Sequence, residues 1–119
     1  LSYGHVLYRA KEAVEKINKE FDNIIGLIDV FSIKPISKNL LNELNKYDMV
    51  LTLEEQCQSG GFGSIILEYI SDNNLDISVK RLALDDKYYF ENGGREYLLD
   101  NHNLSISNIV QNLQTMLGL

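Results

Sequence analysis

Cysteine, proline and tryptophan are almost missing from this chain of 119 residues, which holds one cysteine, one proline and no tryptophan. A single cysteine cannot form an internal disulfide or build a cysteine-rich zinc site. We therefore expect a cytoplasmic protein, because structural disulfides belong mainly to oxidising compartments. Long apolar runs are missing too. A membrane-spanning helix needs about 18 to 20 apolar residues, and no run in the chain approaches that length. We accordingly expect no signal peptide and no membrane partner.

Basic residues are also scarce. The 11 Lys and Arg residues are scattered among 17 Asp and Glu residues, which leaves a net charge of −6. A nucleic-acid surface needs clustered positive charge to neutralise phosphates, so we expect no nucleic-acid partner. The length favours one domain over residues 1–119. Because the chain begins with Leu1 and not Met, we expect a piece of a longer protein.

What the chain does contain is an alternation of helical and extended patterns. Apolar residues at steps of three and four predict a helix over 5–21, which Asp22 and Asn23 interrupt. Nearly continuous apolar runs predict buried strands at 24–31, 49–53 and 77–84. Further helices are expected from Ser37 to about 46, over 62–70, over 95–101, and from Ser105, as N-cap, to Gly118.

Strands that alternate with helices indicate right-handed βαβ units, and hence a parallel sheet with helices on both faces. Three strands would make a thin sheet. We therefore expect Leu1 to Gly4 to be the tail of a first strand whose beginning is truncated. Arg81 lies within the apolar run 77–84, which favours a strand near the sheet edge.

The stretch from Met49 to Ser64 is the strongest candidate for a site. Glu54, Glu55 and Gln56 follow an apolar strand, and Gly60, Gly61, Phe62 and Gly63 precede a helix. In open α/β sheets, ligands bind at the carboxyl ends of strands, and free N–H groups at a helix start bind anions. The glycines lack the spacing of a dinucleotide fingerprint and the ending of a phosphate loop. We favour tight packing of the helix start against the sheet over an anion cradle.

The paired glutamates allow acid–base chemistry or cation binding in principle. Neighbours in an extended chain point to opposite sides, however, so Glu54 and Glu55 would not act as one pair. We favour a polar contact for one and solvent exposure for the other.

Cys57 could act as a nucleophile only with His5 or His102 as partner, and a bystander role is favoured over a cysteine hydrolase. Neither histidine has a third metal ligand at a useful spacing, so no metal site is expected. The aromatic run from Tyr88 to Phe90 is either an exposed interaction patch or a lid over one end of the core, and we leave the two open.

An ordered set of short motifs runs along the chain. Its members are Tyr3-Gly4 with Ala10 and Ala13, Asp29-Val30 with 32–36, Thr52 to Glu55, Gly60 to Ser64, 82–86 with Phe90 and Gly93, and 104–109. In this set the chain resembles the C-terminal domain of transketolase-type thiamine diphosphate enzymes. That group includes transketolase, 1-deoxyxylulose-5-phosphate synthase and the β subunits of 2-oxoacid dehydrogenases. Gln56 stands where many members carry histidine, and Asn103 where glycine is usual. Asparagine tolerates the left-handed conformation, so that turn can survive.

The resemblance implies an α/β fold, a three-layer sandwich with a mostly parallel sheet. It also implies a parent enzyme that transfers two-carbon ketol units between sugar phosphates. Its thiamine diphosphate and Mg²⁺ lie between other domains of a homodimer, so no catalytic, cofactor-binding or metal-ligating residue is expected here. The domain would pack against other domains or a partner subunit. An interdomain or anion contact is expected at Glu54, Glu55, Gln56, Gly60, Gly61, Phe62 and Gly63. The alternative is a free-standing α/β module that binds an anionic ligand or protein partner at the Gly60–Gly63 helix start.

Overall fold

The computed structural model describes residues 1–22 and 24–119. The predicted order of elements is confirmed, apart from the strand expected over 24–31. The elements along the described chain are α1 (Leu7–Phe21), α2 (Lys38–Leu44), β1 (Met49–Cys57), α3 (Phe62–Asp72), β2 (Ser78–Leu84), α4 (Gly94–Asn101) and α5 (Ile106–Leu117).

The sheet is parallel, as the alternating pattern predicts. β1 pairs with β2 so that Met49 lies opposite Ser78 and Leu53 opposite Leu82. On the other side of β1, Ser2 forms parallel bridges to both Leu53 and Asp29. The order across the sheet is therefore the segment around Asp29, the first residues, β1 and β2. Within the described chain β2 is an edge strand, which confirms the interpretation of Arg81.

Two strand predictions need correction. The run 24–31 pairs only through a single bridge at Asp29, because its neighbour in the described sheet is the short segment 1–3. Two backbone hydrogen bonds hold it: Ser2 N–H donates to Ile28, and Val30 N–H donates to Ser2. The strand predicted at 49–53 is longer than expected. β1 continues through the glutamates to Cys57, which pairs with Leu84 after an irregularity in the register.

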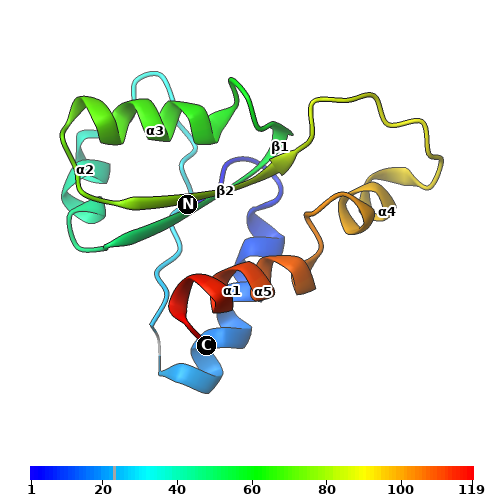
Figure 1. Cartoon of the computed structure of the whole chain (residues 1–119), viewed down its shortest axis with the longest axis horizontal. Coiled ribbons are helices and arrows are strands. Elements are labelled where there is room, and N and C mark those ends of the chain that lie inside the picture. Colours follow the sequence, from blue (N-terminus) through cyan, green and yellow to red (C-terminus); the bar gives the residue numbers. More distant parts are fainter. Residues whose placement is uncertain (23) are drawn as a thin grey trace.

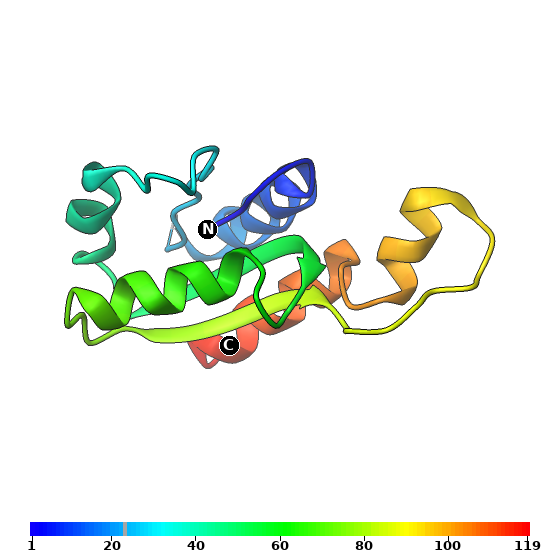
Figure 2. The same cartoon turned by 90° about the horizontal axis from the view of Figure 1, so that it is seen from above.

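Helices cover both faces of the sheet, which makes the three layers visible in Figures 1 and 2. Side chains on β1 alternate between the faces, as extended backbone requires. Leu53 packs in one core with Ala13 of α1 and Leu113 of α5. Val50 packs in a second core with Leu44 of α2 and Ile66 of α3.

The predicted helix ends are formed by the expected residues. Ser37 Oγ accepts from the backbone N–H of Asn39 at 3.3 Å, and Ser105 Oγ accepts from that of Asn108 at 3.1 Å. Gly118 closes α5 with a φ of 71°. Asp22 ends α1 in the left-handed conformation, while Asn23, its expected partner in the break, lies outside the described residues. Asn103 also adopts a positive φ, 68°, as expected for a residue in place of glycine.

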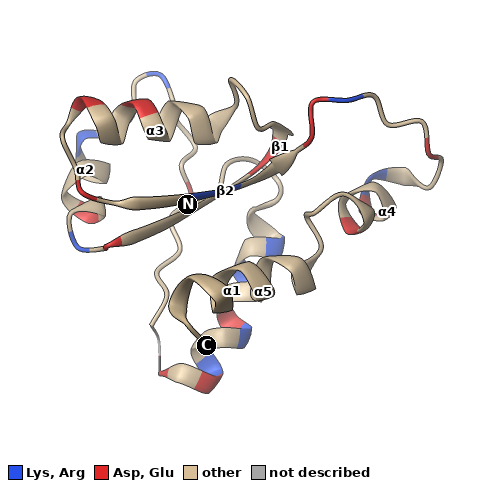
Figure 3. Ribbon diagram, viewed as in Figure 1, with Lys and Arg blue, Asp and Glu red and all other residues tan. Residues whose placement is uncertain are grey.

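Charge is dispersed over the fold. Figure 3 shows basic and acidic residues together on α1, α2 and α4, whereas β2 carries basic residues alone and α5 carries no charged residue. In the part of the chain that the structure describes, no helix has the length and apolar character to cross a membrane.

Candidate functional site

The carboxylate of Glu54 lies at the centre of the candidate site and is completely buried. Alternation along β1 directs it toward α3, where Oε2 accepts from the N–H of Phe62 at 2.5 Å and Oε1 from that of Gly63 at 2.7 Å. The first N–H groups of a helix have no partner within the helix, and its dipole favours negative charge there. The anion at this helix start is therefore a side chain of the protein itself.

Two of the glycines allow the helix start to approach the sheet closely. A Cβ atom on Gly61 would lie 2.5 Å from the carbonyl oxygen of Cys57 and would also overlap the carboxylate of Glu54. One on Gly63 would lie 2.7 Å from Oγ1 of Thr52 and 2.8 Å from Cδ of Arg81. The tight-packing interpretation of these glycines is confirmed. The Phe62 and Gly63 amides, on which an anion cradle would depend, are already bonded to Glu54.

Glu55 points to the opposite face of β1, as its position beside Glu54 predicts. It forms an ion pair with Arg95 of α4, and Nε of Arg95 donates to Oε2 of Glu55 at 3.1 Å. Glu54 therefore contacts α3, and Glu55 contacts α4. Gln56 and Gly60 are exposed, whereas Phe62 and Gly63 are buried. Among the predicted contact residues, Gln56 and Gly60 are open to a partner, and Glu55 and Gly61 are open in part.

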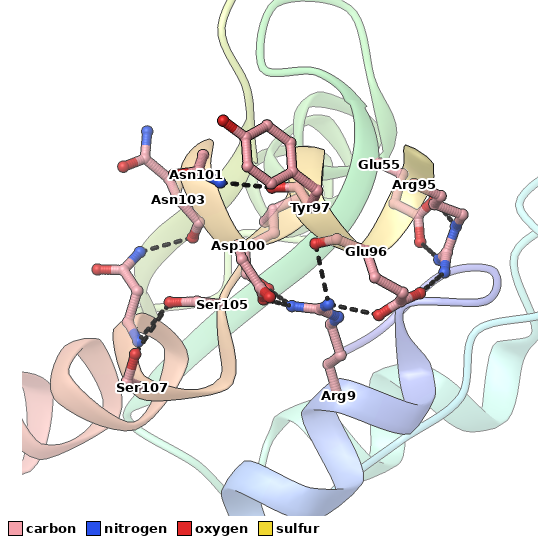
Figure 4. Close-up of polar contacts among 12 residues, drawn as sticks. Arg9, Glu55, Arg95, Glu96, Tyr97, Asp100, Asn101, Asn103, Ser105 and Ser107 are labelled. Atoms are coloured by element: carbon pink, nitrogen blue, oxygen red, sulfur yellow. Dashed lines mark hydrogen bonds and ion pairs between the residues drawn. The ribbon is translucent and has the colours of Figure 1, made fainter. Parts of the chain in front are cut away.

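Arg9 is a residue that the sequence interpretation missed. It comes from α1, is only 9% exposed, and joins α1 to α4 (Figure 4). Nη2 lies 2.5 Å from Oε2 of Glu96, and Nη1 lies 2.5 Å from Oδ1 of Asp100. Nη1 also donates to the carbonyl of Leu104 at 3.0 Å. The available signal was a basic residue within the apolar stripe of the first helix.

The ion pairs continue from Arg9 across α4. Nη1 of Arg95 lies 2.6 Å from Oε1 of Glu96. Glu55, Arg95, Glu96 and Arg9 therefore form a continuous chain of ion pairs (Figure 4). The hydrogen bond from Arg9 is the main reason that the pKa of Glu96 lies below its usual value. This network fixes α4 to the end of β1 and to α1.

The aromatic run 88–90 divides between the two roles left open for it. Tyr89 accepts from the backbone N–H of Asp85 at 2.9 Å, and its ring packs edge-on against His102 at 4.1 Å. Tyr88 and Phe90 are 86% and 87% exposed. Tyr89 is thus half-buried and packs inward against His102, as a lid would, while its two neighbours face solvent.

The cysteine and the two histidines make separate contacts. Cys57 is free and exposed. The ring of His5 packs against Tyr8 and that of His102 against Tyr89. Among the described residues, no group of three His, Cys, Asp or Glu side chains is placed to hold a metal ion.

The fold and the site together define a class of protein. Parallel strands lie between helix layers, and a buried glutamate closes the glycine turn after a central strand. Residues 1–109 match the family "Transketolase, C-terminal domain". The chain belongs to that family, and the resemblance identified from its motifs is confirmed.

Several proteins similar to the chain in sequence are 1-deoxy-D-xylulose-5-phosphate synthases. A 1-deoxy-D-xylulose-5-phosphate synthase from Halothermothrix orenii is 41% identical over 90 residues, covering 74% of this chain and 14% of the relative. The synthase from Rhodopirellula baltica is 37% identical over 93% of this chain and 17% of its own length. The one from Listeria innocua is 31% identical over 99% of this chain and 19% of its own length. The chain thus spans less than a fifth of these relatives.

A solved structure supports the fold. The protein described as "Split gene transketolase, inactive beta4 tetramer" superposes with a TM-score of 0.80 and 29% identity. The match covers 99% of this chain and 38% of the solved one. This likeness confirms the predicted α/β sandwich.

Proposed function

We propose that residues 1–119 form one domain, the C-terminal domain of a cytoplasmic, thiamine diphosphate-dependent enzyme of the 1-deoxy-D-xylulose-5-phosphate synthase type. The observation that carries this proposal is the alignment of 99% of the chain with the Listeria innocua synthase, at 31% identity. The parent enzyme transfers a two-carbon unit to a sugar phosphate. Thiamine diphosphate, when bound, supplies the carbanion chemistry, and the protein supplies position and electrostatics.

The residues of this chain do not fit that cofactor or its Mg²⁺. Two amides that could face a diphosphate, those of Phe62 and Gly63, hold Glu54 instead. The described residues also lack a cluster of metal ligands. We therefore assign no step of the reaction to this chain and place the cofactor in the rest of the parent protein.

The role that we assign to the chain is packing against another domain or subunit in a homo-oligomer. A relative in structure is described as a tetramer, which supports assembly of the parent protein. Gln56 and Gly60, and in part Glu55, offer exposed polar groups beside the turn after β1. The buried Glu54, Phe62 and Gly63, with the tightly packed Gly61, keep that turn in shape.

The reaction can be tested on the full-length parent protein with thiamine diphosphate, Mg²⁺ and a three-carbon aldose phosphate. Pyruvate and a ketose phosphate serve as alternative two-carbon donors. A 1-deoxy-ketose phosphate ends in a methyl group, whereas ketol transfer leaves a hydroxymethyl group at that carbon. Proton NMR distinguishes the two. We expect the methyl product from pyruvate, and formation of neither product would overturn the proposal.

The packing role can be tested on the 119-residue chain itself by thermal shift. A ligand that binds the folded state at a hundredfold excess over its dissociation constant adds about 2.7 kcal/mol of stability. We expect no shift with thiamine diphosphate and Mg²⁺, nor with inorganic phosphate. A shift with the cofactor would place a binding site in this chain. A shift with phosphate alone would support the module that binds anions at the Gly60–Gly63 turn.

A further inference from the structure

The connection from β2 to α4 presents two aromatic rings to solvent. Tyr88 and Phe90 are 86% and 87% exposed, and their ring centroids lie 6.3 Å apart. Tyr97 of α4 adds a ring that is 47% exposed. We call residues 85–101 the aromatic arm. Exposed apolar side chains are normal when they are scattered singly, but a cluster of them marks an interaction site.

The arm holds these rings on a fixed frame. Tyr89, between the two exposed rings, is anchored by its hydrogen bond to Asp85 and by its packing on His102. The ring of Tyr97 lies against Gly93, where a Cβ would come within 2.5 Å of it. Arg9 and Glu55 tie α4 to the body from two further elements. A preorganised aromatic pair loses little conformational freedom on binding.

The place of the arm favours a partner from another chain. In Figures 1 and 2 the arm stands out from the body, beyond the carboxyl end of β2. The first residues run parallel to the 24–31 segment and to β1, and β1 runs parallel to β2. Any residues upstream of Leu1 therefore enter at the edge where the strands begin, the edge opposite the one from which the arm leaves.

We propose that the aromatic arm docks on a second copy of the parent protein, with Tyr88 and Phe90 inserted into an apolar surface of that copy. The inference rests on the proposed function for its oligomeric partner, because the chain spans less than a fifth of its relatives and most of the partner surface lies outside it. Tyrosine and phenylalanine are enriched in interface cores, where a few buried aromatic anchors provide most of the affinity.

The first test is subunit dissociation of the full-length protein, followed by sedimentation. We expect the double variant Tyr88→Ala/Phe90→Ala to raise the subunit dissociation constant at least about thirtyfold, as the loss of a hot-spot residue does. Phe31→Ala is the matched control, because Phe31 is 85% exposed and lies outside the arm. It should change the constant less than about threefold. A monomeric parent protein, an unchanged constant, or an equal loss in the control would overturn the proposal.

The second test identifies the partner directly. One preparation of the full-length protein carries a photo-crosslinking amino acid in place of Tyr88. It is mixed and reassembled with a second preparation whose subunits carry a tag that makes them heavier. We expect a crosslinked product of the summed mass. A crosslink confined to one polypeptide would overturn the proposal and assign the arm to its own chain. Neither test needs cofactor or turnover. If the protein dimerises through the arm but forms no sugar phosphate product, only the proposed function is refuted.

Discussion

The carboxylate of Glu54 accepts a hydrogen bond of 2.7 Å from the backbone N–H of Gly63, nine residues further along the chain. The bond joins the end of a central strand to the start of the helix that covers it. Phe62 donates to the second oxygen of the same carboxylate at 2.5 Å. The amide groups of a motif that resembles a ligand-binding loop are therefore bonded to a side chain of the same protein.

Replacement of Glu54 should destabilise the fold. Glu54→Ala leaves two buried N–H groups without an acceptor, which costs about 3 kcal/mol of unfolding free energy. Glu54→Gln keeps one acceptor and should lose about half as much. Urea denaturation of the 119-residue chain measures both. Glu68→Ala, at an exposed position of α3, is the control, and a similar loss in Glu68→Ala would contradict the assignment.

Gly61 should tolerate no side chain. In Gly61→Ala the new methyl group meets the backbone carbonyl of Cys57, which cannot move aside as a flexible side chain can. Overpacking of this kind costs about 1 to 3 kcal/mol. Gly60 has open space but a φ of 77°, so Gly60→Ala should cost only about 1 kcal/mol, from its backbone conformation. Urea midpoints compare the two variants, and equal losses would show that close packing is not the reason for Gly61.

The glutamates show how far sequence reasoning reaches. Period-two alternation predicts that Glu54 and Glu55 face opposite sides, and they do. Alternation alone does not tell which of the two is buried, because that depends on the position of α3 relative to β1. The same holds for the glycines: their proximity to a helix start is visible in the sequence, but the atoms that a methyl group would meet come from Cys57 and Thr52 in a neighbouring strand.

The run 24–31 shows a second limit. Its composition is that of a buried strand, but strand assignment requires a hydrogen-bonded neighbour, and the described neighbour is the segment 1–3. Arg9 shows a third limit. Helical periodicity places it near the apolar stripe, yet its partners Glu96 and Asp100 lie 87 and 91 residues away. Contacts of that separation follow from the tertiary fold and leave no local signal.

Arg9 should contribute more to stability than its exposed basic neighbours. Arg9→Met removes the hydrogen bonds to Asp100, to the carbonyl of Leu104 and to the side chain and carbonyl of Glu96. We expect a loss of about 2 kcal/mol. Arg9→Lys should recover little of it, because an ammonium group cannot reproduce the guanidinium fork. Lys16→Ala, which breaks an exposed pair with Glu12, should cost less than about 0.5 kcal/mol. Chemical denaturation ranks the three variants, and an Arg9→Met loss no larger than the Lys16→Ala loss would contradict the role.

The Arg9–Glu96 contact should also make stability depend on pH. The hydrogen bond from Arg9 lowers the pKa of Glu96 from its ordinary 4.5 in the folded state. The unfolded state therefore takes up the proton first as the pH falls. The stabilisation by this carboxylate is complete above the ordinary pKa and is lost as the pH drops through the lower, folded value.

The matching measurement compares the unfolding free energy of the wild type and Glu96→Gln from pH 7 down to about pH 3. We expect the wild type to be more stable at neutral pH and the two curves to converge in acid. In an Arg9→Met background, most of this convergence should disappear, because the hydrogen bond that lowers the pKa of Glu96 is absent. A difference between wild type and Glu96→Gln that stays constant across the whole range would show that Glu96 contributes by packing and not by its charge.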